Sequence, residues 1–248
     1  MGTARPPSLD ELRLLAPGVH FPVTICALFF GDHAPLGRKL LGTLYRHTDP
    51  KAFYLRAGLN AVSEETSRLV RAAAEQFGNV QLHLSRKNIR KCPMMRRLFH
   101  QPCLETEWTL WFDDDSYVRR SDWLLSFALQ CEAHPEADLF GAIHSSTPSP
   151  RIQRFIQTAS WFRGRPFLER NGQPVLEFAV GGFWAVRSRL ISQLDWPDPR
   201  LVHFEDDYIF GEALRQRGGQ LGSFHSGVVI SAAPRRGPLQ GPSLLFPS

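Results

Sequence analysis

Apolar runs and helical spacings alternate along the first half of the chain. Two runs, VTICALFF and WTLWF, are apolar throughout, which is typical of strands covered on both faces. Ser63 as an N-cap and Gly78 as a terminator delimit one helix between them. The expected strands are residues 23–30, 52–55, 80–84 and 108–112, and the expected helices are 38–46, 63–77 and a segment beginning near Pro93. This order predicts a three-layer α/β/α domain.

The second half of the chain is less regular and richer in short strands. Asn171-Gly172 lies between two alternating runs and predicts a hairpin, whereas Gly181-Gly182 is expected to break the strand that follows. The other expected elements are helices at 121–132 and 206–216, strands at 138–143, 220–224 and 228–231, and a loop at 148–150. Together the two halves predict a mixed sheet. The expected organisation is an N-terminal extension at 1–22, one domain at 23–231 and an irregular tail at 232–248.

Composition and length indicate an ordinary folded protein. Of 248 residues, 43% are hydrophobic and 21% are charged, which excludes a disordered chain. No apolar run approaches the roughly 20 residues that cross a bilayer, and the N-terminus lacks the basic-then-apolar order of a secretory signal. We therefore expect a cytoplasmic protein with no membrane span, in a reducing compartment where its cysteines stay unpaired. The alternative is the catalytic domain of a longer, membrane-anchored protein of the secretory pathway.

The positions of the charges are more informative than the net charge of +5. Six bases and no acid fall within residues 86–97, whereas acids are concentrated at 113–115 and 205–207. Two acidic clusters would repel a nucleic acid unless a metal ion lies between them, so we expect no nucleic-acid partner. A small anionic substrate such as a diphosphate fits the same distribution.

Three consecutive aspartates, Asp113, Asp114 and Asp115, directly follow the fourth expected strand. Ligands of α/β sheets bind at the carboxyl ends of the strands, so these carboxylates are expected at a binding site. Alternate residues of an extended segment share a side, which places Asp113 and Asp115 together and turns Asp114 elsewhere. Two neighbouring carboxylates with only oxygen ligands suit Mg²⁺ or Mn²⁺. The alternative is a solvated acidic turn.

A second acidic cluster, FEDDY at 204–208, stands where the helix at 206–216 begins. Acids at a helix N-terminus are favoured by the helix dipole, so capping alone is one interpretation. Three acids in succession exceed what a cap needs, and a carboxylate here is a candidate general base. On spacing alone, the single histidine of SFHSG, His225, is a structural residue rather than a metal ligand. The sequence contains no GxGxxG motif after the first strand, no P-loop, no GxSxG and no HExxH, which argues against dinucleotide, P-loop, α/β-hydrolase and zinc-hydrolase chemistry.

Four ordered segments together resemble the GT-A glycosyltransferases, in particular the fringe and β-1,3-glycosyltransferase group (family 31), with broader similarity to family 2. The segments are WTLWFDDDSYV, FAVGGFWAVRSRLISQL, EDDYIFGEALRQRG and SFHSGVVIS, and they cover about residues 23–231. The resemblance implies a Rossmann-like GT-A fold with a donor half at about 23–120 and an acceptor half at about 121–231.

The resemblance also implies roles for individual residues. The implied ligands of Mn²⁺ or Mg²⁺ are Asp113, Asp115 and His225, with Asp115 the more direct. The residues assigned to the donor are Asp114, Lys91, Arg86, Gly181 and Gly182; a solvated basic face is an equal interpretation for the two bases. The residues assigned to the acceptor are Trp184, Trp161 and Glu205, although core packing is the simpler reading of Trp184. The implied general base is Asp207 if this segment is aligned with the family at Gly211. It is Asp206 if the segment is aligned at Glu205.

The expected activity is metal-dependent, inverting transfer of a sugar from a nucleotide sugar, usually a UDP-sugar, to a hydroxyl of a saccharide, peptide or small-molecule acceptor. The expected mechanism uses a metal ion bound to the diphosphate of the donor and an aspartate as the general base. Two alternatives remain open: a nucleotidyltransferase that forms sugar nucleotides, and a catalytically silent carbohydrate-binding protein. The segment GDHAPLGRK after the first strand fits the nucleotidyltransferase poorly.

Overall fold

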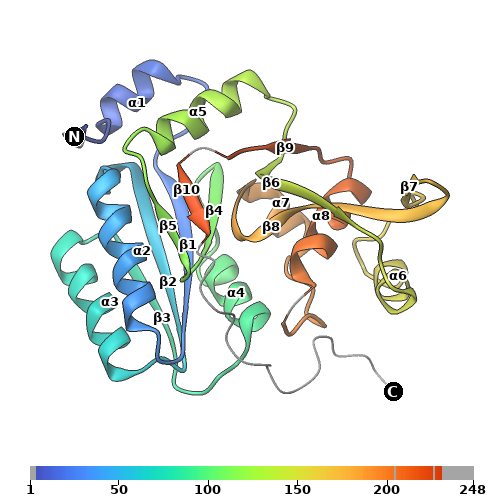
Figure 1. Cartoon of the computed structure of the whole chain (residues 1–248), viewed down its shortest axis with the longest axis horizontal. Coiled ribbons are helices and arrows are strands. Elements are labelled where there is room, and N and C mark those ends of the chain that lie inside the picture. The colour runs from blue at the N-terminus through green and yellow to red at the C-terminus, as the bar shows by residue number, and fades with distance from the viewer. Residues whose placement is uncertain (1–3, 204, 226, 231–248) are drawn as a thin grey trace.

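The computed structural model describes residues 4–203, 205–225 and 227–230. Its main sheet has the strand order β3-β2-β1-β4-β8-β6-β9, with the short β7 paired to β8, and a separate ribbon pairs β5 with β10 (Figure 1). The strands are β1 (Val23–Phe30), β2 (Phe53–Asn60), β3 (Val80–Ser85), β4 (Trp108–Asp113), β5 (Ser116–Val118), β6 (Leu139–Ser146), β7 (Leu168–Arg170), β8 (Gln173–Arg187), β9 (Leu221–Ser223) and β10 (Val228–Ile230). The helices are α1 (Leu9–Leu15), α2 (Ala34–His47), the short 3₁₀ helix η1 (Pro50–Ala52), α3 (Glu64–Phe77), α4 (Lys91–His100), α5 (Trp123–Ala133), α6 (Pro150–Gln157), α7 (Ser188–Leu194) and α8 (Asp206–Gln216).

Strands β1 to β4 form the parallel part of the sheet, with helices on both faces. The side chains of β1 alternate between two cores, because successive residues of a strand point to opposite faces. Ile25 and Phe29 join the core under α2, α3 and α5, whereas Cys26 and Leu28 join the core under α4. The predicted three-layer α/β/α fold with a mixed sheet is confirmed.

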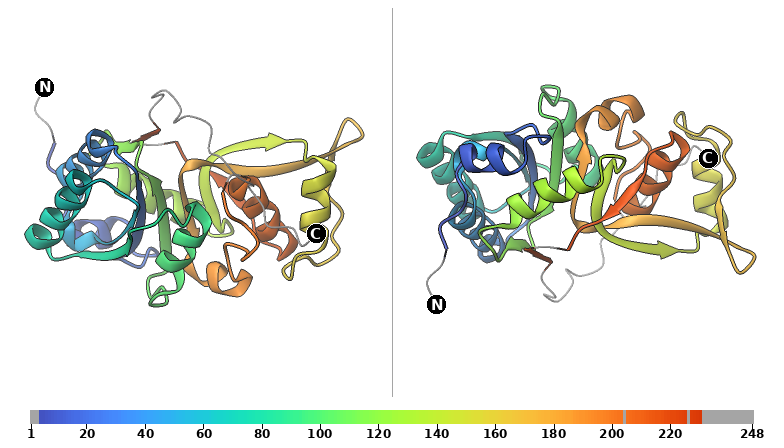
Figure 2. Two further views of the ribbon diagram at one scale, coloured as in Figure 1. Left: turned by 90° about the horizontal axis from the view of Figure 1, so that it is seen from below. Right: turned by 90° about the horizontal axis from the view of Figure 1, so that it is seen from above.

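Strand β8 continues the sheet in the opposite direction and far beyond the end of β4. Its last residues pair antiparallel with β4, from Trp108 with Arg187 to Phe112 with Phe183. Its earlier residues run past Asp113 and pair with β6 and with β7 across the Asn171-Gly172 turn, as the predicted hairpin requires. We call the part formed by β6, β7, the first half of β8, α6 and α8 the antiparallel arm; Figure 2 shows it projecting from the parallel part.

Gly181-Gly182 does not end this strand, since β8 is one strand of 15 residues that includes both glycines. Its pairing with β6 shifts register between Ala179 and Trp184, so the glycines lie at an irregularity within the strand. The loop predicted at 148–150 is also shorter than expected, since α6 begins at Pro150 with Ser149 as its N-cap.

Residues assigned to an N-terminal extension pack against the domain. Leu12, Ala16 and Val19 are buried in the same core as β1 and α5. The backbone of Gly18 donates a hydrogen bond to Glu132 at the end of α5. Among the described residues, no helix is both long and apolar enough to cross a membrane. The predicted tail at 232–248 lies outside the described residues.

Candidate active site

The aspartate triplet lies at the carboxyl end of β4, where the parallel strands end and β8 runs on into the arm. Asp113 is the last residue of β4, and its side chain is 30% exposed. Asp114 turns inward: it is 4% exposed and accepts a hydrogen bond from the backbone of Phe30 at the end of β1. Oδ1 of Asp115 is buried and has no hydrogen-bond partner among the described residues. Asp114 turns inward as expected and supports the neighbouring strand, but Asp114 and Asp115 form the turn between β4 and β5 rather than an extended segment.

Lys91, the first residue of α4, brings its ammonium group among three carboxylates. Its Nζ lies 3.1 Å from Asp206, 3.5 Å from Asp113 and 3.9 Å from Asp207. Its side chain is only 10% exposed. Lys91 thus joins the end of β4 to the start of α8, two segments that the sequence separates by more than ninety residues.

Asn60 holds the loop that positions Lys91. This buried residue ends β2 and donates to the carbonyl of Arg90 at 3.2 Å, while its Oδ1 accepts from the backbone of Ile89 at 2.9 Å. Arg90 precedes α4 with a positive φ of 74°, an uncommon conformation for a residue with a side chain. The contacts of Asn60 therefore help to fix the point at which α4 begins.

Burial and neighbouring charges change the protonation equilibria of this cluster. Burial opposes the charged form of Lys91, but the surrounding carboxylates outweigh it and raise the pKa of Lys91 well above its usual value. Burial raises the pKa of Asp113, with Asp206 and Asp115 adding to the shift. Burial and the adjacent Asp206 raise the pKa of Asp207 well above that of an ordinary aspartate. A raised pKa suits a carboxylate that must accept a proton.

The two aspartates that begin α8 have different surroundings. Asp206 is 3% exposed and forms the shortest contact with Lys91. The side chain of Asp207 is 25% exposed, and its Oδ1 makes no hydrogen bond within the part of the chain that the structure describes. Its carboxylate lies directly against Gly181 on β8, where an added Cβ would stand 2.1 Å from Oδ2. Only glycine at position 181 leaves room for Asp207 in this position.

The start of β5, and Asp115 just before it, also lie next to these glycines of β8. Ser116, which follows Asp115, donates from Oγ to the carbonyl of Gly182 at 2.7 Å. The space above Gly182 is filled by Ile230 of β10. We expected Gly181 and Gly182 to admit the donor sugar; in the structure, protein side chains fill the space at both glycines, so this expectation is corrected.

The residues present fit a divalent cation held by the carboxylates of the triplet. Asp115 offers a buried oxygen without a partner, and oxygen donors suit Mg²⁺ and Mn²⁺. Within the described ranges, no group of three or more histidines, cysteines or acids is arranged to hold a metal ion. Such ions commonly use one or two carboxylates and complete their shell with water and substrate phosphates. Asp113 and Asp115 can supply these carboxylate ligands.

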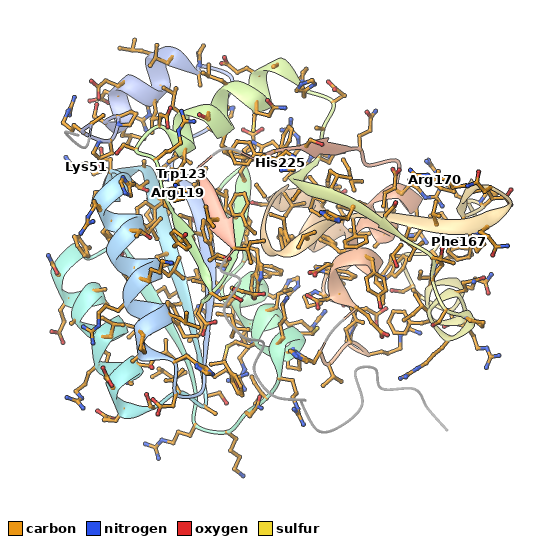
Figure 3. All side chains as sticks on the ribbon, viewed as in Figure 1. Lys51, Arg119, Trp123, Phe167, Arg170 and His225 are labelled. Atoms are coloured by element: carbon orange, nitrogen blue, oxygen red, sulfur yellow. The ribbon has the colours of Figure 1, made fainter. Side chains whose placement is uncertain are left out.

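His225 does not join these carboxylates. In the ribbon of β5 and β10, Ile230 pairs with Ser116 and Val228 with Val118, so β10 approaches Asp115 with its last residue. His225 precedes the other end of β10 and is exposed. Figure 3 shows it on the segment between β9 and β10, apart from the labelled Arg119 and Trp123. The expectation that His225 completes the metal shell is therefore not supported by its position, and Ser226 beside it lies outside the described residues.

Both tryptophans assigned to the acceptor are core residues, which corrects that expectation. Trp161 is 1% exposed, and Trp184 is 2% exposed and stacks on Trp111. Glu205 precedes α8 in a left-handed conformation and is half-buried. Arg86 is exposed after β3, as a solvated base would be. Phe204, part of the predicted cluster, lies outside the described residues.

Two surface hollows lie away from the carboxylates. One, of about 390 Å³, lies between α2 and α3 and is lined by Leu41, Tyr45 and Phe77 among others. The other, of about 510 Å³, lies beside the start of β4 and is lined by Glu107, Arg187 and Arg189 among others. We place the candidate active site at the cluster around Lys91, because charged groups converge there at the carboxyl end of β4 and shifted pKa values cluster at functional sites.

Comparison with known proteins gives the fold class but no family. No model of a known protein family matches the chain, and no curated protein matches it in sequence. Solved structures do match, and three of them are named here. The mannosyltransferase PcManGT from Pyrobaculum calidifontis, in complex with GDP-Man and Mn²⁺, is 16% identical with a TM-score of 0.62, over 89% of this chain and 59% of that one.

The other two solved structures are also similar in fold and low in sequence identity. TarS from S. aureus is 16% identical with a TM-score of 0.57, over 86% of this chain and 37% of that one. GalNAc-T7 with UDP, GalNAc and Mn²⁺ is 11% identical with a TM-score of 0.58, over 82% of this chain and 41% of that one. The chain thus spans less than two thirds of the length of each. Its mixed α/β fold is that of the GT-A glycosyltransferases.

Proposed function

We propose that the chain is a metal-dependent glycosyltransferase that moves a sugar from a nucleotide-sugar donor to an acceptor hydroxyl. The observation that carries this proposal is the convergence of Asp113, Lys91 and the Asp206-Asp207 pair at the carboxyl end of β4 in a GT-A fold. Solved structures of the same fold contain GDP-Man or UDP together with Mn²⁺. The resemblance to the fringe group favours a UDP-sugar and inversion at the anomeric carbon.

In the proposed reaction the donor side of the site is formed by the triplet and Lys91. Asp115 and Asp113 would hold the divalent ion, which when bound neutralises negative charge on the leaving diphosphate. Lys91 stands with its ammonium group in the same cluster and can meet the phosphates from the α4 side. The neighbouring carboxylates raise the pKa of Lys91, so its ammonium group stays protonated, which suits this contact.

Asp207 is the proposed general base. Asp206 is committed to Lys91 and almost fully buried, whereas Asp207 keeps an oxygen without a hydrogen-bond partner and a raised pKa. Asp207 takes the proton of the acceptor hydroxyl while the acceptor oxygen forms its bond to the anomeric carbon. The bond from that carbon to the diphosphate breaks on the opposite face, and the nucleoside diphosphate leaves.

The test measures release of nucleoside diphosphate from a panel of UDP- and GDP-sugars with Mn²⁺ and a set of saccharide acceptors. We expect Asp207→Asn to lower kcat by about 10²- to 10⁴-fold, the usual contribution of a general base, while nucleotide binding persists. Asp115→Asn should weaken Mn²⁺ and nucleotide binding. Asp10→Asn, a change at an exposed residue of α1, is the matched control and should leave both unchanged.

Other outcomes would overturn the proposal. A wild-type protein that binds neither Mn²⁺ nor any nucleotide sugar contradicts it directly. Pyrophosphate release from a nucleoside triphosphate and a sugar phosphate would favour the nucleotidyltransferase instead. Tight binding of Mn²⁺ and UDP without turnover across the whole panel would favour the silent binding protein.

A further inference from the structure

Two buried tryptophans lie side by side beneath the carboxylates, on neighbouring strands of the sheet. Trp111 of β4 and Trp184 of β8 are register partners, and their ring centroids are 5.9 Å apart with planes at 16°. They are 0% and 2% exposed. Phe99 of α4 packs edge-on against both rings. The two side chains are therefore nearly equivalent in their burial and in their apolar contacts.

Their indole N–H groups differ. Nε1 of Trp111 donates a hydrogen bond to Oδ1 of Asp113 at 3.1 Å. Nε1 of Trp184 is buried and has no hydrogen-bond partner in the described part of the chain. The same core therefore accommodates an indole without using its N–H, so burial by itself does not account for the bond that Trp111 makes to Asp113.

Asp113 is held from both sides. Trp111 contacts Oδ1, and Lys91 stands 3.5 Å from Oδ2. The ammonium of Lys91 also lies over the ring of Trp111, 5.6 Å from its centroid, which favours the cation where it is. An aspartate at the end of a strand, partly open to solvent, would otherwise sample several side-chain orientations.

We infer that Trp111 is a positioning residue, whose indole N–H fixes the carboxylate of Asp113 in the orientation that binds the metal ion and the donor nucleotide. This inference rests on the proposed function and adds to it a residue that touches neither metal nor substrate. Partners of this kind, hydrogen-bonded to a ligating group, typically change metal affinity by 10- to 100-fold when they are removed.

The two tryptophans provide a matched experiment. Trp111→Phe and Trp184→Phe remove the same atoms from the same stack, and only the first removes a hydrogen bond to Asp113. We would measure the affinity for Mn²⁺ and for UDP in the presence of Mn²⁺ by calorimetry, without turnover, together with Tm. We expect similar losses of Tm in the two variants. Only Trp111→Phe should weaken Mn²⁺ and UDP binding, by about 10- to 100-fold, with KM for the donor rising more than kcat falls.

A second pair of variants keeps the experiment decisive if either phenylalanine variant fails to fold. Benzothienylalanine has the shape of tryptophan with sulfur in place of the N–H, so its incorporation at 111 or at 184 preserves the stack and removes only the donor. Equal binding by the 111 and 184 variants would overturn the inference while leaving the proposed function intact. A wild-type protein that binds neither Mn²⁺ nor UDP would instead remove the proposed function, and this inference with it.

Discussion

The parallel part of the sheet and the antiparallel arm are stabilised by different kinds of contact. In the parallel part, long apolar side chains of β1 and β4 fill two cores between strands and helices. In the arm, α8 lies so close to β8 that backbone meets backbone: an added Cβ on Gly211 would stand 2.0 Å from the carbonyl oxygen of Glu177. Both parts have apolar cores, and the arm adds a close backbone contact that only glycine at position 211 allows.

This difference bears on function, because the two parts meet at the candidate site. The parallel part supplies Asp113, Asp115 and Lys91, and the arm supplies Asp206 and Asp207. Donor binding should therefore depend on the parallel part, and proton removal should depend on how closely α8 approaches β8. The following changes test this division, beginning with the largest expected effect.

Gly211→Ala should destabilise the protein strongly. The new methyl group would overlap backbone atoms of Glu177 and Phe178, which cannot rotate away, so α8 must move off β8. We expect a loss of about 3 kcal/mol in the free energy of unfolding, at the upper end of overpacking effects. Urea unfolding followed by circular dichroism measures it.

Gly42→Ala is the matched control, at an exposed position inside α2 where an added Cβ meets no atom within 4 Å. Here alanine should stabilise by about 0.5 to 1 kcal/mol, because glycine is the poorer helix former. If both glycine changes have the same sign and size, the arm does not depend on close backbone approach in the way described.

Gly181→Ala should separate catalysis from donor binding. Its methyl group would displace the carboxylate of Asp207, and a misplacement of about 1 Å can cost 10²-fold in rate. We expect kcat for glycosyl transfer to fall by about that factor, while the affinity for UDP and Mn²⁺ stays within a few-fold of wild type. An unchanged kcat would exclude Asp207 as the base, and an equal loss of nucleotide affinity would show that the two functions are not divided between the two parts.

The smallest expected effect compares two helix caps. Ser63 caps α3 in the parallel part and Ser149 caps α6 in the arm, and each accepts a hydrogen bond of 3.3 Å from a backbone N–H. Replacing either serine by alanine should cost about 1 kcal/mol. The losses should appear as equal shifts of one cooperative transition, because buried residues of α6 share a core with Cys26 of β1. A shift confined to hydrogen exchange in α6 after Ser149→Ala would show that the arm opens on its own.

The sequence predicted best those elements, in both parts of the molecule, that local patterns determine. β1 and α8 have the predicted bounds, Ser63 caps α3, and the hairpin turns at Asn171-Gly172. These features follow from apolar runs, capping residues and turn chemistry that lie within a few positions of one another.

Features that depend on segments approaching from elsewhere in the fold were harder to predict. The sequence suggested that Gly181 and Gly182 break a strand. The structure shows why both positions are glycine: Asp207 lies directly against Gly181, and Ile230 lies directly against Gly182. The resemblance assigned Trp184 to the acceptor. In the structure its side chain lies in the core, on the side set by its pairing with Trp111. His225 seemed close to the aspartates, but the antiparallel register of β10 and β5 sets it at the far end.

The pairing of β8 with β4 and with β7 determines which changes of chain length the protein can accept. Residues added at the exposed Asn171-Gly172 turn would lengthen the end of the arm and leave every pairing beneath it unchanged. A single residue inserted between Gly182 and Arg187 would instead reverse the sidedness of every position on one side of the insertion. Trp184 would then face the opposite core, or Gly181 would turn away from Asp207. Diversity among related chains should therefore accumulate at the tip of the arm, while the length of the strand between the tip and the site stays constant.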